Sequence, residues 1–346
     1  MLNSISINNF KSLEKIDMQF SNFNLITGTN SSGKSSLFQA ILIASQRNGE
    51  DLLNGNAISL GKKKNVINEN VDRDGCCQIK YVFDGKNSLI GFGEERDNEI
   101  NCDKSLFLFE NNLYYLSANR LGVKDVYPKN SERNLIFGRD GDFIFDYFVR
   151  HQNDKIEDSF SSYLSKGERK TLNSVVNHWL ERLSGYRVLV RDLDDTNVIQ
   201  ISFYKGALNE MTTKYRPQHV GTGVTYILEQ LIVGLASKAN DIILVENPEL
   251  HLHPSAQHDL NNFYYWLSQK NRQIFIETHS DHFFNGMRVI KSHNLESSTK
   301  VFFFHQIENV TNVVEVEMGE FGIIDNMKED LFDQFDKDLT RMLVRD

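Results

Sequence analysis

Residues 28–35 read GTNSSGKS and satisfy the phosphate-loop pattern G-x-x-x-x-G-K-[ST]. An apolar run at residues 23–26 predicts a strand before this segment, and the residues from Lys34 onward predict a helix after it. Glycines let backbone amides turn toward a polyphosphate at a helix start, the lysine reaches the β- and γ-phosphates, and the final hydroxyl can ligate Mg²⁺. The pattern predicts a nucleoside triphosphate site. Its cofactor-binding residues are expected to be Asn30, Ser31, Ser32, Gly33, Lys34, Ser35 and Ser36.

The composition is that of an ordinary globular protein. The chain has 346 residues, of which 40% are hydrophobic and 25% are charged, so it is long enough for a large core and for two lobes. There are 38 basic and 47 acidic residues, which give a formal net charge of −9. This balance argues against a surface that attracts nucleic acid uniformly, although it leaves room for a local basic groove.

The sequence predicts a cytoplasmic protein. Its three cysteines lack the C-x-x-C spacing of metal sites and are too few for a disulfide framework, which indicates a reducing compartment. Residues 1–8 show no basic region followed by an apolar core, so we expect no signal peptide. The most apolar window, residues 226–236, is interrupted by polar residues and is too short to span a bilayer. We therefore expect no membrane domain.

The pattern of strands and helices changes twice along the chain. Residues 1–47 predict strands, the phosphate loop and a helix, whereas the chain from residue 217 onward alternates between helices and buried strands, as parallel β/α units do. Between them, residues 48–216 mix short strands, loops and helical stretches. The expected fold is therefore an α/β nucleotide-binding domain in two halves, 1–47 and 217–346, split by an inserted α+β lobe at 48–216.

Charged side chains follow two of the predicted buried strands. Glu246 ends the first strand, and Thr278 and His279 follow the second. A carboxylate at the end of a buried strand is where P-loop enzymes hold Mg²⁺ and its waters. Because ligands sit at the carboxyl ends of parallel strands, we expect the His279 imidazole at the same nucleotide edge.

These stretches, ENPELHLHP at 246–254 and THS at 278–280, resemble ABC-type ATPases of the RecF, SMC and Overcoming-Lysogenization-Defect group. The resemblance covers residues 1–47 and about 217–306 and implies a P-loop NTPase of ABC type that uses ATP and Mg²⁺. Residues 9–13 also resemble the N-terminal strand pair of that group, and residues 115–120 and 330–335 resemble its small bacterial members.

The resemblance implies roles for individual residues. Lys34 would hold phosphate, Ser35 and Glu246 would bind the metal or its waters, and His279 would contact the γ-phosphate. Asn119 or Arg120, after a predicted strand, could contact the nucleotide from the inserted lobe.

The segment HVGTGVT at 219–225 contains two glycines, Gly221 and Gly223, at a predicted helix start. It resembles the family signature that binds the γ-phosphate held by a second subunit, and a helix start with bare amides is a suitable anion site. A simple helix cap is the alternative reading. If the signature applies, the resemblance implies a homodimer or higher homo-oligomer.

One position departs from the family pattern. When Pro248 is aligned with the family proline, Asn247 stands where the catalytic glutamate is expected. An amide cannot accept a proton from the attacking water, so we expect hydrolysis that is slow or that relies on another group, such as His279 or Glu249.

Other clusters leave alternatives open. His251, His253 and His279 could bind zinc, although the family pattern needs no metal there. Asp192 and Asp194 resemble a Toprim nuclease D-x-D but lie where a hairpin turn is predicted. A basic cluster could face DNA or could be a solvated surface. Its members are Lys166, Arg169, Lys170, Arg182, Arg187 and Arg191.

Together these features predict a dimeric ATP switch that controls a separate effector. The segment after His279 is expected to be too short for a Toprim nuclease domain, so the effector would be another polypeptide. By resemblance, it would be a nuclease in bacterial antiphage defence. The alternative is a RecF-like DNA repair or maintenance ATPase that acts directly on DNA, for which salt-dependent DNA binding would be diagnostic.

Overall fold

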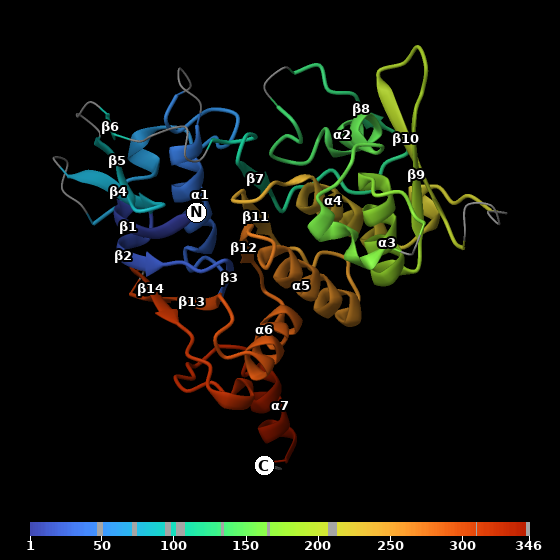
Figure 1. Ribbon diagram of the computed structural model, residues 1–346. Coiled ribbons are helices and arrows are strands. Elements are labelled where there is room, and N and C mark those ends of the chain that lie inside the picture. Colours follow the sequence, from blue (N-terminus) through green and yellow to red (C-terminus); the bar gives the residue numbers. More distant parts are fainter. Residues whose placement is uncertain are drawn as a thin grey trace.

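The computed structural model describes residues 1–46, 51–70, 75–93, 98–101, 108–132, 135–164, 167–206, 213–308 and 310–343. In Figure 1 these residues form β-sheets flanked by helices, with the N-terminal strands and the helices α2–α4 on opposite sides of a central sheet. Within the described residues, no helix combines the length and the apolar character that crossing a bilayer requires.

The central sheet has six strands in the order β14-β13-β3-β12-β11-β7. All neighbours in it are parallel except β13 and β14. Because parallel strands end at the same edge, the carboxyl ends of β3, β12, β11 and β7 meet there. The strands are Phe23–Gly28 (β3), Leu113–Leu116 (β7), Ile242–Glu246 (β11), Gln273–Glu277 (β12), Thr299–Ile307 (β13) and Val310–Glu315 (β14).

Side chains of the central strands alternate between two hydrophobic cores. In β11, Ile242 and Leu244 pack into one core, whereas Ile243 and Val245 pack into the other. Both faces of the sheet are therefore covered. This burial explains why the strand sequences are almost continuously apolar.

One face is covered by the helix of the phosphate loop, α1 (Lys34–Ser45), and by a five-stranded antiparallel sheet. That sheet has the order β2-β1-β4-β5-β6. The hydroxyl of Tyr81 in β4 donates to the Ala40 carbonyl at 2.7 Å and so fixes α1 to the sheet. The strands are Leu2–Phe10 (β1), Leu13–Gln19 (β2), Cys76–Phe83 (β4), Lys86–Gly93 (β5) and Glu99–Asn101 (β6).

The other face is covered by α4 (Thr222–Ala236), α5 (Pro254–Ser268) and α6 (Asp281–His293). A small antiparallel sheet, β8-β10-β9, and two helices continue outward from α4 and α5 (Figure 1). These elements are Tyr127–Pro128 (β8), Ile144–His151 (α2), Leu172–Ser184 (α3), Arg187–Asp192 (β9) and Val198–Tyr204 (β10). The last helix, α7 (Gln334–Leu343), lies near the C-terminus.

Sheet pairing places part of residues 48–216 within the framework that carries the phosphate loop. Strand β4 pairs with β1, and β7 pairs with β11 in the central sheet. The described residues of 117–216, which we call the outer lobe, contribute no strand to either of these two sheets. The division at residues 47 and 217 expected above stays a prediction.

A buried arginine connects the outer lobe to the central sheet. Arg272, directly before β12, forms an ion pair with Glu157 at 2.5 Å and donates to the carbonyls of Ser237 and Lys270. Only 1% of its side chain is exposed. A buried charge with complete hydrogen bonding is costly to remove, because its partners lose their donors inside the protein.

We predict that Arg272→Gln lowers the free energy of unfolding by about 3 kcal/mol, since it leaves buried acceptors without donors. Urea denaturation measures the change. Lys300→Gln, which breaks the surface ion pair with Glu315, is the control and should cost far less. Equal losses in the two variants would contradict this role of Arg272.

Candidate functional site

The phosphate loop connects the end of β3 to the start of α1. Gly28 has a φ of +146°, and a Cβ there would lie 1.9 Å from the carbonyl oxygen of Phe304. Gly33 has a φ of +96°, and a Cβ there would lie 2.7 Å from the hydroxyl oxygen of Thr311. The backbone path and the neighbouring strands therefore require both glycines of the motif.

The remaining loop residues differ in exposure. Asn30 and Ser31 are exposed, whereas Ser32 is buried and its hydroxyl donates to the Thr29 carbonyl at 2.8 Å. Ser36 is half-buried in the first turn of α1. The structure thus places the tip of the loop at the surface and anchors its base.

Lys34 lies inside the curve of the loop. Its ammonium donates to the carbonyls of Gly28 at 3.1 Å and Thr29 at 2.6 Å. An ammonium has three donors, so one donor is left for a further acceptor. Burial lowers the pKa of Lys34, while the nearby Glu277 carboxylate opposes this shift.

Ser35, the expected metal ligand, contacts a carboxylate that the sequence analysis did not select. Its hydroxyl donates to Glu277 Oε1 at 2.9 Å. Glu277 is the last residue of β12 and pairs in register with Glu246, the last residue of β11. Burial and repulsion from Glu246 raise the pKa of Glu277 to about 7. The position of Glu277 at the end of a predicted buried strand could have identified it from the sequence. The sequence analysis selected the following residues, Thr278 and His279, instead.

The turn after β11 holds Glu246 and Asn247 in different ways. Glu246 Oε2 accepts a hydrogen bond from the Ala118 amide at 3.1 Å. Asn247 has a left-handed backbone, with a φ of +43°, which asparagine tolerates better than most residues. The backbone amide of Asn247 donates to the Glu277 carbonyl at 2.8 Å. Its side-chain oxygen is buried without a hydrogen-bond partner among the described residues.

Glu249 holds the turn that follows β12. One of its carboxylate oxygens accepts from the Thr278 hydroxyl at 2.8 Å and the other from the His279 amide at 2.9 Å. Burial raises the pKa of Glu249. The His279 side chain is exposed, and burial followed by the charge of Lys34 lowers the pKa of its imidazole. The Lys34 ammonium is therefore near enough to the His279 imidazole to disfavour its protonation.

Arg120 reaches the same edge from the loop after β7. Its guanidinium donates to the backbone carbonyls of Glu246 at 2.7 Å and Asn247 at 2.9 Å. Arg120 is buried, whereas the neighbouring Asn119 is exposed. Of the two residues considered in the sequence analysis, Arg120 is thus the one that the structure joins to the turn after β11.

The two glycines at the start of α4 have different surroundings. A Cβ on Gly223 would lie 2.6 Å from the His251 carbonyl oxygen, whereas a Cβ on Gly221 would meet nothing within 4 Å. Gly223 is therefore needed for packing against the turn that contains His251. Gly221, the N-cap residue, lies on an open surface.

The zinc and nuclease alternatives find no support in the described part of the chain. No group of three or more His, Cys, Asp and Glu side chains in that part is arranged to hold a metal ion. Asp192 instead forms an ion pair with Lys129 at 2.5 Å, at the end of β9. The H-x-H residues His251 and His253 contact Tyr226 and Ser255 respectively.

Much of the expected basic cluster is already engaged within the protein. Lys170 pairs with Asp158, and Arg187 pairs with Glu181. Arg182 stacks over the Trp179 ring. Lys166 lies outside the described residues.

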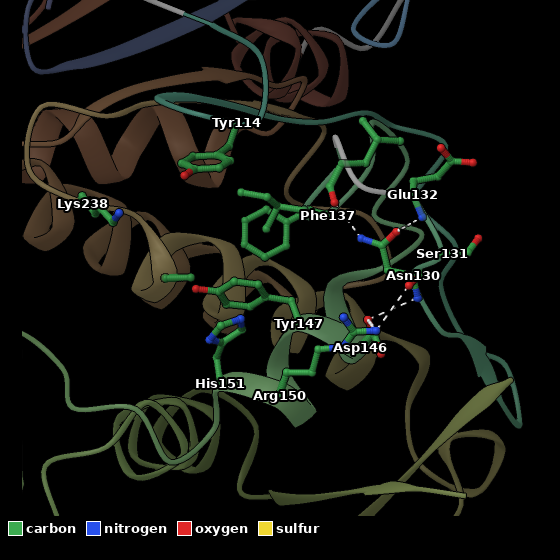
Figure 2. Close-up of a pocket in the computed structure, with 13 residues that line it drawn as sticks. Tyr114, Asn130, Ser131, Glu132, Phe137, Asp146, Tyr147, Arg150, His151 and Lys238 are labelled. Carbon is green, nitrogen blue, oxygen red and sulfur yellow. Dashed lines mark hydrogen bonds and ion pairs between the residues drawn. The ribbon is translucent and has the colours of Figure 1, made fainter. Parts of the chain in front are cut away.

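A hollow of about 510 Å³ lies away from the phosphate loop, between β7, α2 and the C-terminal end of α4 (Figure 2). Tyr114, Tyr147, His151 and Lys238 line one part of it. The hollow contains none of the nucleotide-site residues described above. The size of a hollow alone therefore does not locate the nucleotide site in this chain.

We predict that Glu277 makes the stability of the nucleotide-free protein fall as pH rises. Its folded pKa of about 7 exceeds its ordinary value of 4.5, so the folded state binds more protons across this window. Replacing Glu277 by Gln should reduce this fall. At about pH 8 the free energy of unfolding of the variant should exceed that of the wild type by an amount on the order of 1 kcal/mol or more. Thermal unfolding of both proteins from about pH 5 to about pH 8 measures the difference. Parallel pH profiles would contradict the burial of a titrating carboxyl group at this position.

Comparison with known proteins identifies the fold and the family. A family model described as AAA ATPase domain matches residues 1–134 and 218–284, and one described as a protein of unknown function (DUF3696) matches residues 296–342. No curated protein matches the chain significantly.

Among solved structures, the chain is similar to an SMC head bound to the C-terminal winged-helix domain of ScpA, with a TM-score of 0.61, 14% identity, and coverage of 91% of this chain and 97% of that one. It is also similar to the SMC head domain from Thermotoga maritima, with a TM-score of 0.51, 15% identity, and coverage of 92% and 99%. A third similar structure is the Pyrococcus furiosus SMC head bound to the C-terminal domain of ScpA, with a TM-score of 0.57, 12% identity and 99% coverage of both chains.

These similarities show the fold of an ABC-type ATPase head, in agreement with the expected α/β P-loop architecture. The AAA ATPase domain match covers more than half of the chain. The chain is therefore an ATPase that belongs to the AAA ATPase domain family.

Proposed function

We propose that this ATPase is a slow, dimeric switch that controls a separate effector enzyme, a nuclease, in bacterial antiphage defence. The proposal rests on Asn247, which stands where a catalytic glutamate is expected, in a site that has the phosphate loop, Lys34 and Glu246. Its amide cannot act as a base toward water. Glu249 is committed to holding Thr278 and His279, so it is not a free substitute. Slow hydrolysis suits a protein that must persist in its ATP state.

The residues at the sheet edge fit ATP and Mg²⁺. The loop and Lys34 would hold the phosphates, while Ser35, Glu246 and Glu277 would hold the cation or its waters. Glu277 Oε2 is buried and has no hydrogen-bond partner among the described residues. A bound cation would supply the partner that this oxygen lacks and so lower the cost of burying it. Mg²⁺ commonly combines one or two carboxylates with phosphates and waters, so a complete protein cage is not required. When bound, the cation would supply charge neutralisation at the phosphates.

The start of α4 supports pairing of two subunits. Gly221 lies on an open surface at a helix N-terminus, where backbone amides favour an anion. We infer that this surface contacts the γ-phosphate held by a second copy, in a head-to-tail dimer with two-fold symmetry.

The outer lobe is the surface that we propose for the effector. It contributes no strand to the sheets that carry the nucleotide site, it reaches their edge through Ala118 and Arg120, and it contacts α4 and α5 through α3. Two of the similar SMC heads were solved with domains of ScpA, which supports partner docking for heads of this fold. Because several members of the basic cluster are internally paired, we favour this role over direct action on DNA.

We predict that Lys34→Ala strongly weakens Mg·ATP binding, because it removes a charge-assisted contact to the phosphates. Calorimetry measures the affinity, and Lys80→Ala on β4 is a control that should bind normally. Unchanged binding by Lys34→Ala would contradict the assigned site.

Pairing can be tested separately with Gly221→Glu, which adds a bulky charge at an exposed position where a Cβ would meet nothing within 4 Å. This variant should bind ATP but fail to dimerise in light scattering. Mixed with Lys34→Ala protein, it should restore one composite site per heterodimer and thus part of the hydrolysis. ATP-dependent dimers of Gly221→Glu with normal stability would contradict the proposed interface.

We further predict that co-expression with the neighbouring gene product yields a complex whose nuclease activity changes in Lys34→Ala and Glu246→Gln. Metal-dependent DNA cleavage by this chain alone, abolished by Asp192→Ala with Asp194→Ala, would contradict the effector proposal. Salt-dependent DNA binding by the isolated chain, without any effector, would favour the RecF-like alternative.

A further inference from the structure

The loop after β7 places one arginine between the nucleotide edge and helix α4. Arg120 donates from Nη1 to the carbonyls of Ser117 and Glu246, and from Nη2 to the carbonyl of Asn247. The last two carbonyls belong to the turn that presents the Glu246 carboxylate and the Asn247 amide. The guanidinium is buried, so this turn depends on a donor that water cannot replace.

The opposite side of the same guanidinium faces a buried carboxylate on α4. Arg120 Nε lies 3.9 Å from Glu229 Oε2, and both side chains are 0% exposed. This separation is beyond hydrogen-bond range. Among the described residues, Arg120 Nε and both Glu229 oxygens lack a well-formed hydrogen-bond partner. The two side chains therefore lie close together without a hydrogen bond between them.

The neighbourhood adds to this incomplete bonding. The Thr225 hydroxyl, one helical turn before Glu229 on α4, is also buried without a partner among the described residues. The Tyr226 ring lies 5.6 Å from the Arg120 guanidinium. Burial raises the pKa of Glu229 to about 8, although Arg120 and the nearby backbone amide of Gly122 oppose the shift. Buried charges with partly satisfied partners are costly, and a small displacement that completes the hydrogen bond would lower that cost.

Helix α4 is also attached to the segment after β11 at other points. Gln230 donates to the Pro248 carbonyl at 3.2 Å, and Gly223 packs against His251. A shift of α4 would therefore displace the turn that follows β11. Arg120 is the member of this contact set that holds the carbonyls of Glu246 and Asn247 directly.

We propose that Arg120 is a positioning residue that couples α4 to the turn after β11, because its Nε lies near Glu229 on α4 while its Nη1 and Nη2 donate to the two backbone carbonyls of the turn. The inference rests on the proposed role of α4 in contacting the nucleotide of a second subunit. It adds that engagement of α4 is transmitted within one subunit to the carboxylate and amide beside its own nucleotide. Arg120 acts through this turn and makes no contact with the nucleotide itself.

The test compares Arg120→Lys, Arg120→Gln and Glu229→Gln with Arg272→Gln as the matched control. Arg272 is likewise a buried arginine that forms an ion pair and donates to two backbone carbonyls, but it precedes β12 at the far end of that strand. Three quantities are measured for each folded variant: the Kd for Mg·ATP by calorimetry, kcat with KM, and ATP-dependent dimerisation by light scattering. Thermal unfolding gives the folded fraction.

We expect Arg120→Gln and Glu229→Gln to lower kcat by about 10- to 100-fold, the usual effect of losing a residue that orients a site, while Kd and KM change by less than about threefold. The kcat of the variant that combines Arg120→Gln and Glu229→Gln should be no lower than that of the more impaired single variant, because both changes interrupt the same connection. Arg272→Gln should lower stability but leave the kcat of the folded protein unchanged. If Arg120→Gln does not fold, Arg120→Lys and Glu229→Gln still carry the test.

Three results would overturn the inference. The first is a kcat for the Arg120 and Glu229 variants that falls only in proportion to the folded fraction, as for a structural residue. The second is a loss of Mg·ATP affinity in Arg120→Gln as large as that in Lys34→Ala, which would indicate direct nucleotide contact. The third is an unchanged kcat in Glu229→Gln. A wild-type protein that never dimerises with ATP would instead contradict the proposed function, so the two failures can be told apart.

Discussion

The parallel pairing of β3, β12 and β11 is the constraint on which the rest of the site depends. Its register sets Glu277 beside Ile26 on one side and beside Glu246 on the other. A slip of either strand by one residue would turn the carboxylate of that strand to the opposite face of the sheet. With the register in place, Glu277 meets Ser35 of the phosphate loop, and the turn after β11 comes within reach of Arg120.

The protein treats buried charge differently at the two ends of its central sheet. Arg272 has an ion-pair partner and several backbone acceptors, so it fixes the outer lobe to the sheet. At the nucleotide edge, Glu277 and Glu229 keep oxygens without hydrogen-bond partners among the residues described. Satisfied buried charges favour one arrangement, whereas unsatisfied ones leave free energy to be gained by a ligand or a shift. This contrast matches a rigid scaffold that carries a responsive site.

Sequence reasoning succeeded where the information is local and missed what depends on distant pairing. The glycines of the phosphate loop follow a local pattern, and their positive φ values and close contacts explain it. Glu277 and Ser35 are 242 positions apart, and only the strand register brings them together. Within residues 48–216, where the sequence predicts helical stretches without a local signal for their packing, the structure has α2, a 3₁₀ turn at Asp158–Tyr163 and α3. Pairing of β4 with β1 likewise involves strands whose proximity no local pattern reveals.

The measurement that tests the central claim most directly is single-turnover hydrolysis of Mg·ATP by the wild-type protein and by Asn247→Asp. Aspartate tolerates the left-handed backbone at this position and supplies a carboxylate where the amide stands. We expect a wild-type rate well below the typical enzyme turnover of about 10 s⁻¹, a faster rate for Asn247→Asp, and no gain in rate for Asn247→Ala. A wild-type rate at or above that typical value, with Asn247→Asp slower, would contradict the assignment of this ATPase as a slow switch.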